Sequence, residues 1–302
     1  MPMKILLIGN RETSENPEAY YGEYQAFFAE AAGKSSTKPE ILYTLIEDLF
    51  ISVGDDTFMV YDTRSKLDLK DFRLVIIRAK GLRQYFDVVK AISCYANLNN
   101  IKIINDYSEF RDSSKLTQAV QFFQTGLPVA CSVFVNKAVL EGRVTLGFPF
   151  PCIMKATFGA HGNDNYLVKS LEEANEIAAK SHQLNFVMQR FVPNEKDYRL
   201  LVIGDDVLVI GREAVEGSHL NNTSQGGSAN LAEEQEVPAE VIEDAKKITK
   251  YLGMTFSGVD VLADSNTGKF YFLEVNSQPQ LMSGAFIDKK IEIVGRYFDT
   301  LD

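Results

Sequence analysis

The sequence has little of what marks several common protein classes. It contains only three cysteines in 302 residues, widely separated and with no pair at metal-ligand spacing. Structural zinc is therefore not expected, and the thiols are expected to be reduced, as in a cytosolic protein. No apolar stretch approaches the length of a membrane span, and the short run after the first residues is too brief for a secretion signal. These absences predict a soluble cytoplasmic protein with no membrane partner.

Positive charge and familiar catalytic motifs are also scarce. The chain has 31 Lys and Arg against 41 Asp and Glu, a formal net charge of −10. Nucleic acids and anionic membranes require a basic surface, so neither is expected as the main partner. Any anionic ligand must instead meet local cations. The sequence has no Walker loop, no GxGxxG and no GxSxG nucleophile motif.

Apolar residues, by contrast, are numerous enough to form more than one hydrophobic core. At 302 residues the chain is longer than a single hydrophobic core usually supports. Hydrophobic residues make up 45% of it, enough to form more than one core. Alternating strand and helix patterns predict an N-terminal Rossmann-like α/β domain over residues 1–110. It includes a helix from about Pro17 to Ala32 that Gly33 is expected to stop, and a second helix from about residue 82 to 98.

The most informative segments are two strand-like runs near the C-terminus, Ser257–Leu262 and Phe270–Asn276, joined by hairpin-like residues. Alternation along the second strand puts Glu274 and Asn276 on one face, where Asp260 of the first strand can join them. Two carboxylates and a carboxamide suit Mg²⁺ that also binds nucleotide phosphates. The alternative is charged positions on the solvent face of a hairpin.

Upstream, a predicted strand places Lys155 just before a turn that contains Gly159 and Gly162. Backbone N–H groups of such a turn can surround phosphate oxygens, and the lysine adds a compact positive charge. Taken alone, the motif also fits an ordinary hairpin. Further along, residues 217–236 have turn formers without sustained periodicity, which predicts a mobile loop.

In combination, these segments resemble the ATP-grasp superfamily, and most closely the RimK-type ligases, which are related to glutathione synthetases. The resemblance covers roughly residues 73–295. It is carried by Lys115, Lys155, the glycine turn, Gln189–Val192, Asp197–Arg199, Arg212, Asn221-Asn222 with Gly226-Gly227, and the set Asp260, Glu274 and Asn276. The resemblance implies an ATP-grasp fold of mixed α/β and α+β class. Its two lobes, residues 111–185 and 186–302, would clamp ATP beside the N-terminal domain.

The resemblance also implies roles for residues that would bind the nucleotide. Lys115 and Lys155 correspond to lysines that bind the phosphates, and the turn from Gly159 to Gly162 corresponds to the loop that covers them. Asp197 stands where the family holds the ribose.

Three hinge residues, Gln189, Arg190 and Phe191, correspond to the segment whose backbone reads the adenine edge. Arg212 and Asn222 stand where the family contacts the transferring phosphoryl group and the substrate, with Lys155 as a further catalytic cation.

The metal set is implied in the same way. Asp260, Glu274 and Asn276 correspond to the ligands of two Mg²⁺ ions, with Mn²⁺ as a substitute, and Glu274 would bridge the ions. Two positions depart from the family: Leu220 replaces a loop arginine, and Gln280 follows Pro279 where glycine is common. The first departure puts a substrate or phosphate contact in doubt.

The implied activity is that of an ATP-dependent carboxylate–amine ligase. A carboxylate would attack ATP to give an acyl phosphate and ADP, and an amine would then displace phosphate. The expected partners are an amino-acid, peptide or protein carboxylate and an amine acceptor, and a homo-oligomer is left open. Arg78 resembles an arginine near the acceptor site, with a surface salt bridge as the alternative. Two other functions also stay open: an ATP-grasp kinase that phosphorylates a hydroxyl, and a nucleotide-binding regulator without turnover.

Overall fold

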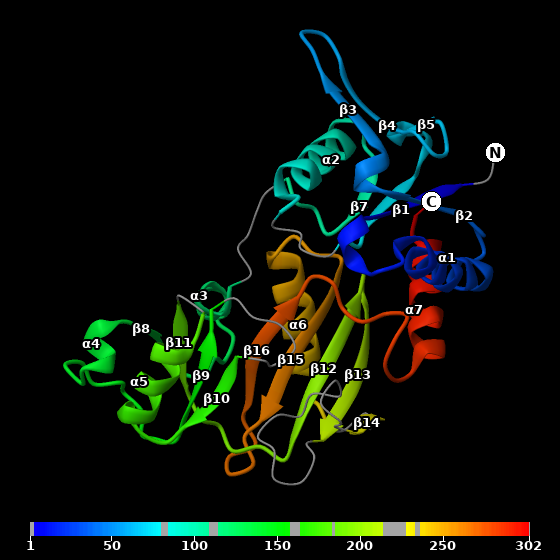
Figure 1. The fold of residues 1–302 in the computed structure, drawn as a ribbon. Helices are drawn as coiled ribbons and strands as arrows, with labels where there is room; N and C mark the ends of the chain where they lie inside the picture. Colours follow the sequence, from blue (N-terminus) through cyan, green and yellow to red (C-terminus); the bar gives the residue numbers. More distant parts are fainter. Residues whose placement is uncertain are drawn as a thin grey trace.

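The computed structural model describes residues 3–79, 84–108, 114–157, 164–182, 185–213, 228–232 and 236–301. Its strands form three larger sheets and one small antiparallel sheet (Figure 1). The N-terminal unit lies at the top of the view, a four-stranded sheet lies at the left, and a five-stranded sheet lies between them. This mixed α/β and α+β architecture is the class that the sequence predicted.

The N-terminal unit is built on a parallel sheet with the strand order β2-β1-β6-β7. The core strands β1 and β6 are short apolar runs that are almost entirely buried, as expected for a parallel sheet covered by helices. The chain adds β2 beside one edge of β1 and later adds β6 beside the other. The carboxyl ends of β1 and β6 therefore meet at a topological switch point, where open α/β sheets usually bind ligands. The elements are β1 (Lys4–Gly9), α1 (Pro17–Lys34), β2 (Glu40–Leu45), β6 (Leu74–Ile77), α2 (Phe86–Leu98) and β7 (Lys102–Ile104).

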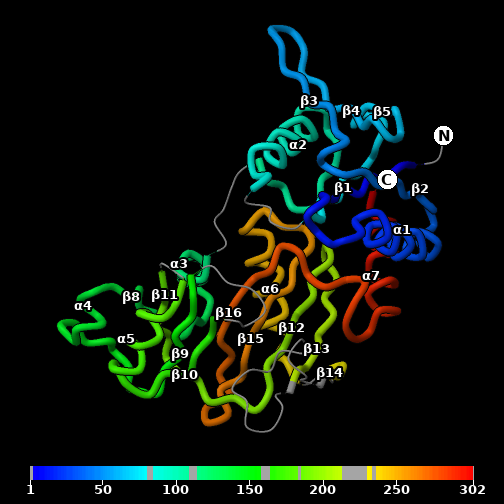
Figure 2. Tube along the Cα trace, in the orientation of Figure 1, coloured from blue at the N-terminus to red at the C-terminus, as the bar shows by residue number. Residues whose placement is uncertain are grey.

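The last helix of the chain, α7 (Ile287–Asp299), packs on the first helix, α1. The two lie side by side in both views (Figures 1 and 2), and their apolar faces share one buried cluster with β1. Gly295 permits the close approach, because a Cβ there would lie 2.8 Å from the carbonyl oxygen of Ala31. The C-terminus therefore completes the core of the N-terminal unit.

This contact also decides where α1 ends. Gly33 was expected to stop the helix, but α1 continues through it to Lys34, so that prediction is wrong. The chain leaves the helix where Asp299 of α7 accepts hydrogen bonds from the Ser35 hydroxyl at 2.8 Å and the Ser36 N–H at 2.7 Å. For α2, the expected start near residue 82 lies outside the described residues, and the helix begins at Phe86.

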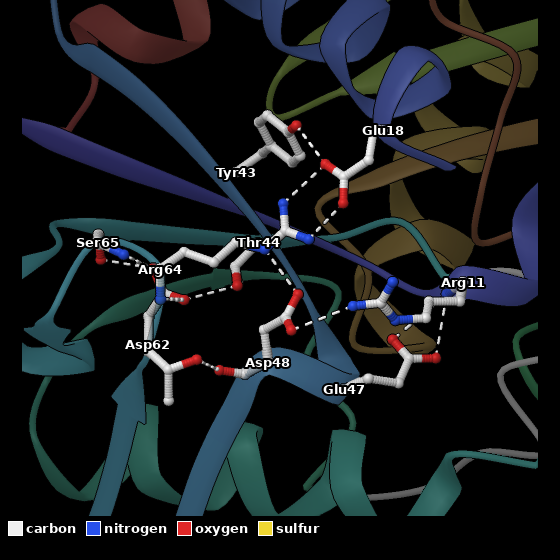
Figure 3. Close-up of polar contacts among 10 residues, drawn as sticks. Arg11, Glu18, Tyr43, Thr44, Glu47, Asp48, Asp62, Arg64 and Ser65 are labelled. Atoms are coloured by element: carbon white, nitrogen blue, oxygen red, sulfur yellow. Dashed lines mark hydrogen bonds and ion pairs between the residues drawn. The ribbon is translucent and has the colours of Figure 1, made fainter. Parts of the chain in front are cut away.

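A small antiparallel sheet extends from the N-terminal unit, and its β3–β4 hairpin projects at the top of Figure 1. A partly exposed network of hydrogen bonds ties its base to α1 and β2 (Figure 3). Arg64 donates to both oxygens of Glu18, at 2.8 and 2.5 Å, and to Asp48 at 2.6 Å. The hydrogen bonds from Arg64 and Tyr43 lower the pKa of Glu18 to about 2. The sheet contains β3 (Leu49–Val53), β4 (Phe58–Asp62) and β5 (Leu67–Asp68).

The second large sheet is antiparallel, with the order β10-β9-β11-β8. One of its faces packs on α4 and α5 through an apolar cluster. Its elements are β8 (Ser132–Val135), α4 (Lys137–Leu140), β9 (Cys152–Ala156), β10 (Asn165–Val168), α5 (Leu171–Lys180) and β11 (Phe186–Arg190).

The third sheet is antiparallel and five-stranded, with the order β14-β13-β12-β15-β16. Helices α3 and α6 cover one face through a shared apolar cluster that includes Phe122 and Ile248. Residues 217–236 were expected to form a loop. Four of them form the strand β14, and residues 217–227 and 233–235 lie outside the described residues. The elements are α3 (Lys115–Gln124), β12 (Lys196–Ile203), β13 (Asp206–Glu213), β14 (Ser228–Leu231), α6 (Ala239–Tyr251), β15 (Phe256–Ala263) and β16 (Phe270–Asn276).

Helix α3 joins the second and third sheets. Ser114 caps it by accepting from the Thr117 N–H, and the Lys115 N–H donates to the Thr157 carbonyl just past β9. On the other side, the Gln118 side chain exchanges two hydrogen bonds with the backbone of Val275 in β16, at 3.1 and 2.8 Å. Lys115 is thereby fixed between the two sheets. Across the described ranges, no helix has both the length and the hydrophobicity to cross a bilayer.

Candidate active site

The predicted metal ligands lie on two paired strands. Asp260 of β15 is directly opposite Glu274 of β16, and Gly258 is opposite Asn276. Residues opposite each other in an antiparallel pair project to the same face. The strands that the sequence predicted are confirmed, and this register brings two carboxylates and one carboxamide to one face. In the described part of the chain, no group of three or more His, Cys, Asp or Glu gathers as a metal site.

Asp260 is buried in a network with two arginines. Arg199 donates to both oxygens of Asp260, the Nη2–Oδ2 distance being 2.8 Å, and Arg212 Nη2 lies 3.2 Å from Oδ1. Gly258 makes room for Arg199, because a Cβ there would lie 2.9 Å from the arginine Cδ. On its other side, Arg212 donates from Nε to Asp197 at 2.5 Å. The network therefore runs from Arg199 through Asp260 and Arg212 to Asp197.

Strand register explains this network. Arg199 pairs with Asp260 between β12 and β15, and Asp197 pairs with Arg212 between β12 and β13. Alternation sends Asp197 and Arg199 to the same face of β12. Because the strand order is β13-β12-β15, two acids and two bases from three strands meet there.

Burial and charge shift the two carboxyl groups in opposite directions. For Asp197, burial and the nearby Asp260 charge outweigh Arg212 and raise the pKa to about 6. For Asp260, burial alone would raise the pKa, but Arg199 and Arg212 hold it below its ordinary value. Asp260 is therefore ionised at neutral pH, and both of its oxygens are engaged by arginines.

Two lysines face these acids from the other sheet and from α3. Lys115 Nζ lies 4.0 Å from Glu274 Oε1. Lys155 Nζ, at the end of β9, donates to Gln189 Oε1 at 2.9 Å, and Gln189 Nε2 donates to Ser132 Oγ at 3.0 Å. Burial and the charge of Lys115 lower the pKa of Lys155 to about 8, while Glu274 and Asp260 oppose the shift. The two ammonium groups and the two carboxylates thus share one region.

The hinge residues connect the two sheets. Gln189 and Arg190 end β11, and the Arg190 N–H already donates to the Cys131 carbonyl at 2.8 Å. The Arg190 guanidinium lies over the ring of Tyr271 in β16, 5.1 Å from its centroid. Phe191 follows, half-buried, where the chain passes from one sheet to the other.

The remaining predicted residues separate into two groups. Asp197, expected beside a ribose, is only 8% exposed and neutralises Arg212; its ribose contact stays a prediction. Gly159, Gly162 and Asn222 lie outside the described residues. Sequence reasoning gave no role to Arg199, although its alternation with Asp197 could have placed it on the site face.

Comparison with known proteins decides the family. Residues 135–300, more than half of the chain, match the RimK-like ATP-grasp domain. The chain belongs to the RimK-like ATP-grasp family. The tetrahydromethanopterin:alpha-L-glutamate ligase of Methanosarcina acetivorans is 27% identical over 266 residues, covering 79% of this chain and 78% of that protein. A probable alpha-L-glutamate ligase of Xanthomonas euvesicatoria pv. vesicatoria is 33% identical over 177 residues, covering 57% and 58%.

Solved structures agree on the fold. The ATP-grasp ligase PsnB complexed with its minimal precursor has a TM-score of 0.72 and 17% sequence identity, covering 100% of this chain and 98% of that one. The chain thus has the ATP-grasp fold, and it is an ATP-dependent ligase that forms carbon–nitrogen bonds. This finding favours the ligase over the kinase and the regulator.

Proposed function

We propose that this RimK-like ligase joins a carboxylate to the amine of an amino acid through an acyl phosphate, using the face that carries Asp260 and Glu274. The observation that carries the proposal is the convergence of opposed charges. Lys115 and Lys155 approach from one side, and two carboxylates meet them from paired strands.

ATP would lie between these groups. Lys155, positioned by Gln189, and Lys115 would bind the phosphates, and the segment from Gln189 to Phe191 would bind the adenine. The donor set of Asp260, Glu274 and Asn276 fits two Mg²⁺ ions, or Mn²⁺ in their place, because it offers hard oxygen ligands only. When bound, the ions would neutralise charge on the phosphates.

The described side chains would then orient the reactants. Arg212 is fixed by Asp197 and Asp260, so its guanidinium would be positioned to stabilise charge on the transferring phosphoryl group. A carboxylate oxygen forms a bond to the γ-phosphorus as the bond to ADP breaks. The amine nitrogen next bonds to the acyl carbon, phosphate leaves, and the amine proton passes to phosphate or water. Positioning and fixed charge supply the catalysis, and no protein nucleophile is needed.

The names of the relatives suggest an acceptor. The relatives above are named a tetrahydromethanopterin:alpha-L-glutamate ligase and a probable alpha-L-glutamate ligase, and the PsnB structure contains its minimal precursor. We therefore propose L-glutamate as the first acceptor to test, with a small-molecule or peptide carboxylate as the other substrate.

The test is product analysis after incubation with Mg-ATP, L-glutamate and pooled carboxylates, including peptides. The proposal expects ADP and a product heavier by one glutamyl residue, in equal amounts, with no product when a non-hydrolysable ATP analogue replaces ATP. A phosphorylated product without an amide would establish the kinase instead. Bound nucleotide with no acceptor-dependent ADP would establish the regulator.

A further inference from the structure

Asp260 is the candidate metal ligand that already has cationic partners. Arg199 donates to both of its carboxylate oxygens, with Nη2 2.8 Å from Oδ2, and Arg212 Nη2 lies 3.2 Å from Oδ1. The side chain of Asp260 is only 10% exposed, so water weakens these interactions little. A divalent cation must therefore approach an acid whose charge two arginines already neutralise.

The two arginines are held unequally. Arg212 Nε also donates to Asp197 at 2.5 Å, and the Arg212 side chain is 7% exposed. The Arg199 side chain is 20% exposed, and among the described residues Asp260 is its only acidic partner. Arg199 is therefore the arginine that can leave Asp260, because it is the more exposed of the two and no second acid holds it.

Arg199 also lies on the face that the candidate metal ligands share. Its Cδ and Nη1 are each 2.9 Å from the position that a Cβ on Gly258 would take. Gly258 is opposite Asn276, just as Asp260 is opposite Glu274, so the two pairs are neighbours on one face. The positive charge of Arg199 there opposes that of any divalent cation bound by the same three side chains.

Both the charge and the lone pairs of Asp260 are limited. A carboxylate offers about four lone-pair sites, and three arginine nitrogens already contact its two oxygens. Repulsion between a guanidinium and a divalent cation on one carboxylate is strong in a partly buried site, where screening by water is reduced. Arg199 in its present position is therefore incompatible with tight binding of a divalent cation by Asp260.

We propose that Arg199 and a divalent cation compete for Asp260, so that binding of the ion releases Arg199 from the carboxylate. Arg199 then lowers the affinity of the site for divalent ions and keeps the buried acid compensated. Arg212 stays in place because Asp197 holds it. Since Arg199 acts through Asp260, it is a positioning residue. The inference rests on the metal role of Asp260 in the proposed function.

The test measures metal affinity directly. Arg199→Gln removes the charge and keeps a hydrogen-bond donor, whereas Arg199→Lys keeps the charge. Arg296→Gln is the matched control, because Arg296 is 55% exposed and pairs with Asp206 at the surface. Each protein is titrated with Mn²⁺ by calorimetry without nucleotide, since Mn²⁺ accepts the same oxygen ligands as Mg²⁺. Melting temperatures are measured with and without Mn²⁺.

Arg199→Gln should bind Mn²⁺ about tenfold more tightly than wild type, because the competing charge is gone. Arg199→Lys and Arg296→Gln should stay within about threefold of wild type. The double variant Arg199→Gln/Asp260→Asn should lose the gain. Without Mn²⁺, Arg199→Gln should melt below wild type, since Asp260 has lost a cation, and Mn²⁺ should raise its melting temperature more than that of wild type.

A Mn²⁺ affinity of Arg199→Gln at or below that of wild type would overturn the competition. So would a gain that persists in Arg199→Gln/Asp260→Asn, because the ion would then bind elsewhere, or an equal gain in Arg199→Lys, because charge would then not be its cause. If Arg199→Gln is too unstable to titrate, saturating Mn²⁺ should restore its folding, and a failure to do so would equally contradict the proposal. Absence of amide product with every carboxylate would refute the ligase function instead, since these measurements need no turnover.

Discussion

Two networks of charged side chains in this molecule are built from the same residue types and have opposite consequences. In the N-terminal unit, the side chains of Arg64, Glu18 and Asp48 are 28%, 50% and 21% exposed, so each charge keeps some contact with water if a partner is lost. On the face of the five-stranded sheet, Asp197, Arg212 and Asp260 are each less than 10% exposed. There a lost partner leaves a desolvated charge, so the buried network is sensitive to every change of charge.

The largest effect on stability is expected for Arg212→Met. The substitution leaves Asp197 buried without a cation and should lower the free energy of unfolding by about 3–5 kcal/mol, measured by urea denaturation. The double variant Arg212→Met/Asp197→Leu should recover much of that loss, because it removes both charges. A single variant as stable as wild type would show that the buried network behaves like the exposed one.

Lys155→Met should weaken binding of a non-hydrolysable ATP analogue by roughly 10- to 100-fold in calorimetry, since a hydrogen bond to a charged group contributes about 1.5–3 kcal/mol. Gln189→Ala, which removes only the group that positions Lys155, should stay within about tenfold. Equal affinity in wild type and Lys155→Met would remove the phosphate role.

The two networks should also respond to pH with opposite signs. The pKa of Asp197 is raised from 3.8 to about 6 in the folded state, so its contribution to stability is fully present only below pH 3.8 and is lost as the pH rises through about 6. The pKa of Glu18 is lowered to about 2, so its contribution is present above about pH 4.5 and is lost as the pH falls toward 2. The unfolding free energy of wild type minus that of Asp197→Asn should therefore decrease between pH 4 and 7. The corresponding difference between wild type and Glu18→Gln should not decrease over this range. A difference for Asp197→Asn that rises over this range would reverse the assignment.

The smallest effect is expected in the exposed network. Arg64→Gln should cost about 1 kcal/mol or less in unfolding free energy, because exposed ion pairs contribute little. Ligase activity should be unchanged. A loss as large as that of Arg212→Met would mean that the β3–β5 sheet is essential for the N-terminal unit.

The sequence was most informative where local geometry suffices. Asp260, Glu274 and Asn276 share a face because alternation and a short hairpin require it, with no knowledge of other strands. The ion-pair network of Asp260 was not predictable in this way. It depends on β12 lying beside β15, which are separated by more than fifty residues of chain.

The end of the first helix was mispredicted for a related reason. Gly33 does not stop α1, because the helix end is set by contact with Asp299 at the far end of the chain. A tertiary contact there overrides the local preference.

The most direct test of the account is the turnover of Glu274→Gln, with Glu292→Gln as the matched control in an exposed ion pair. If Glu274 holds catalytic metal ions, losing its charge should lower the kcat for ADP formation by roughly 10²–10³-fold, since one electrostatic partner of the transition state is removed. Its melting temperature should stay at the wild-type value, because Glu274 lies half-buried on a strand face. A Glu274→Gln protein that melts like wild type and keeps more than about a tenth of the normal rate would contradict the metal-site assignment.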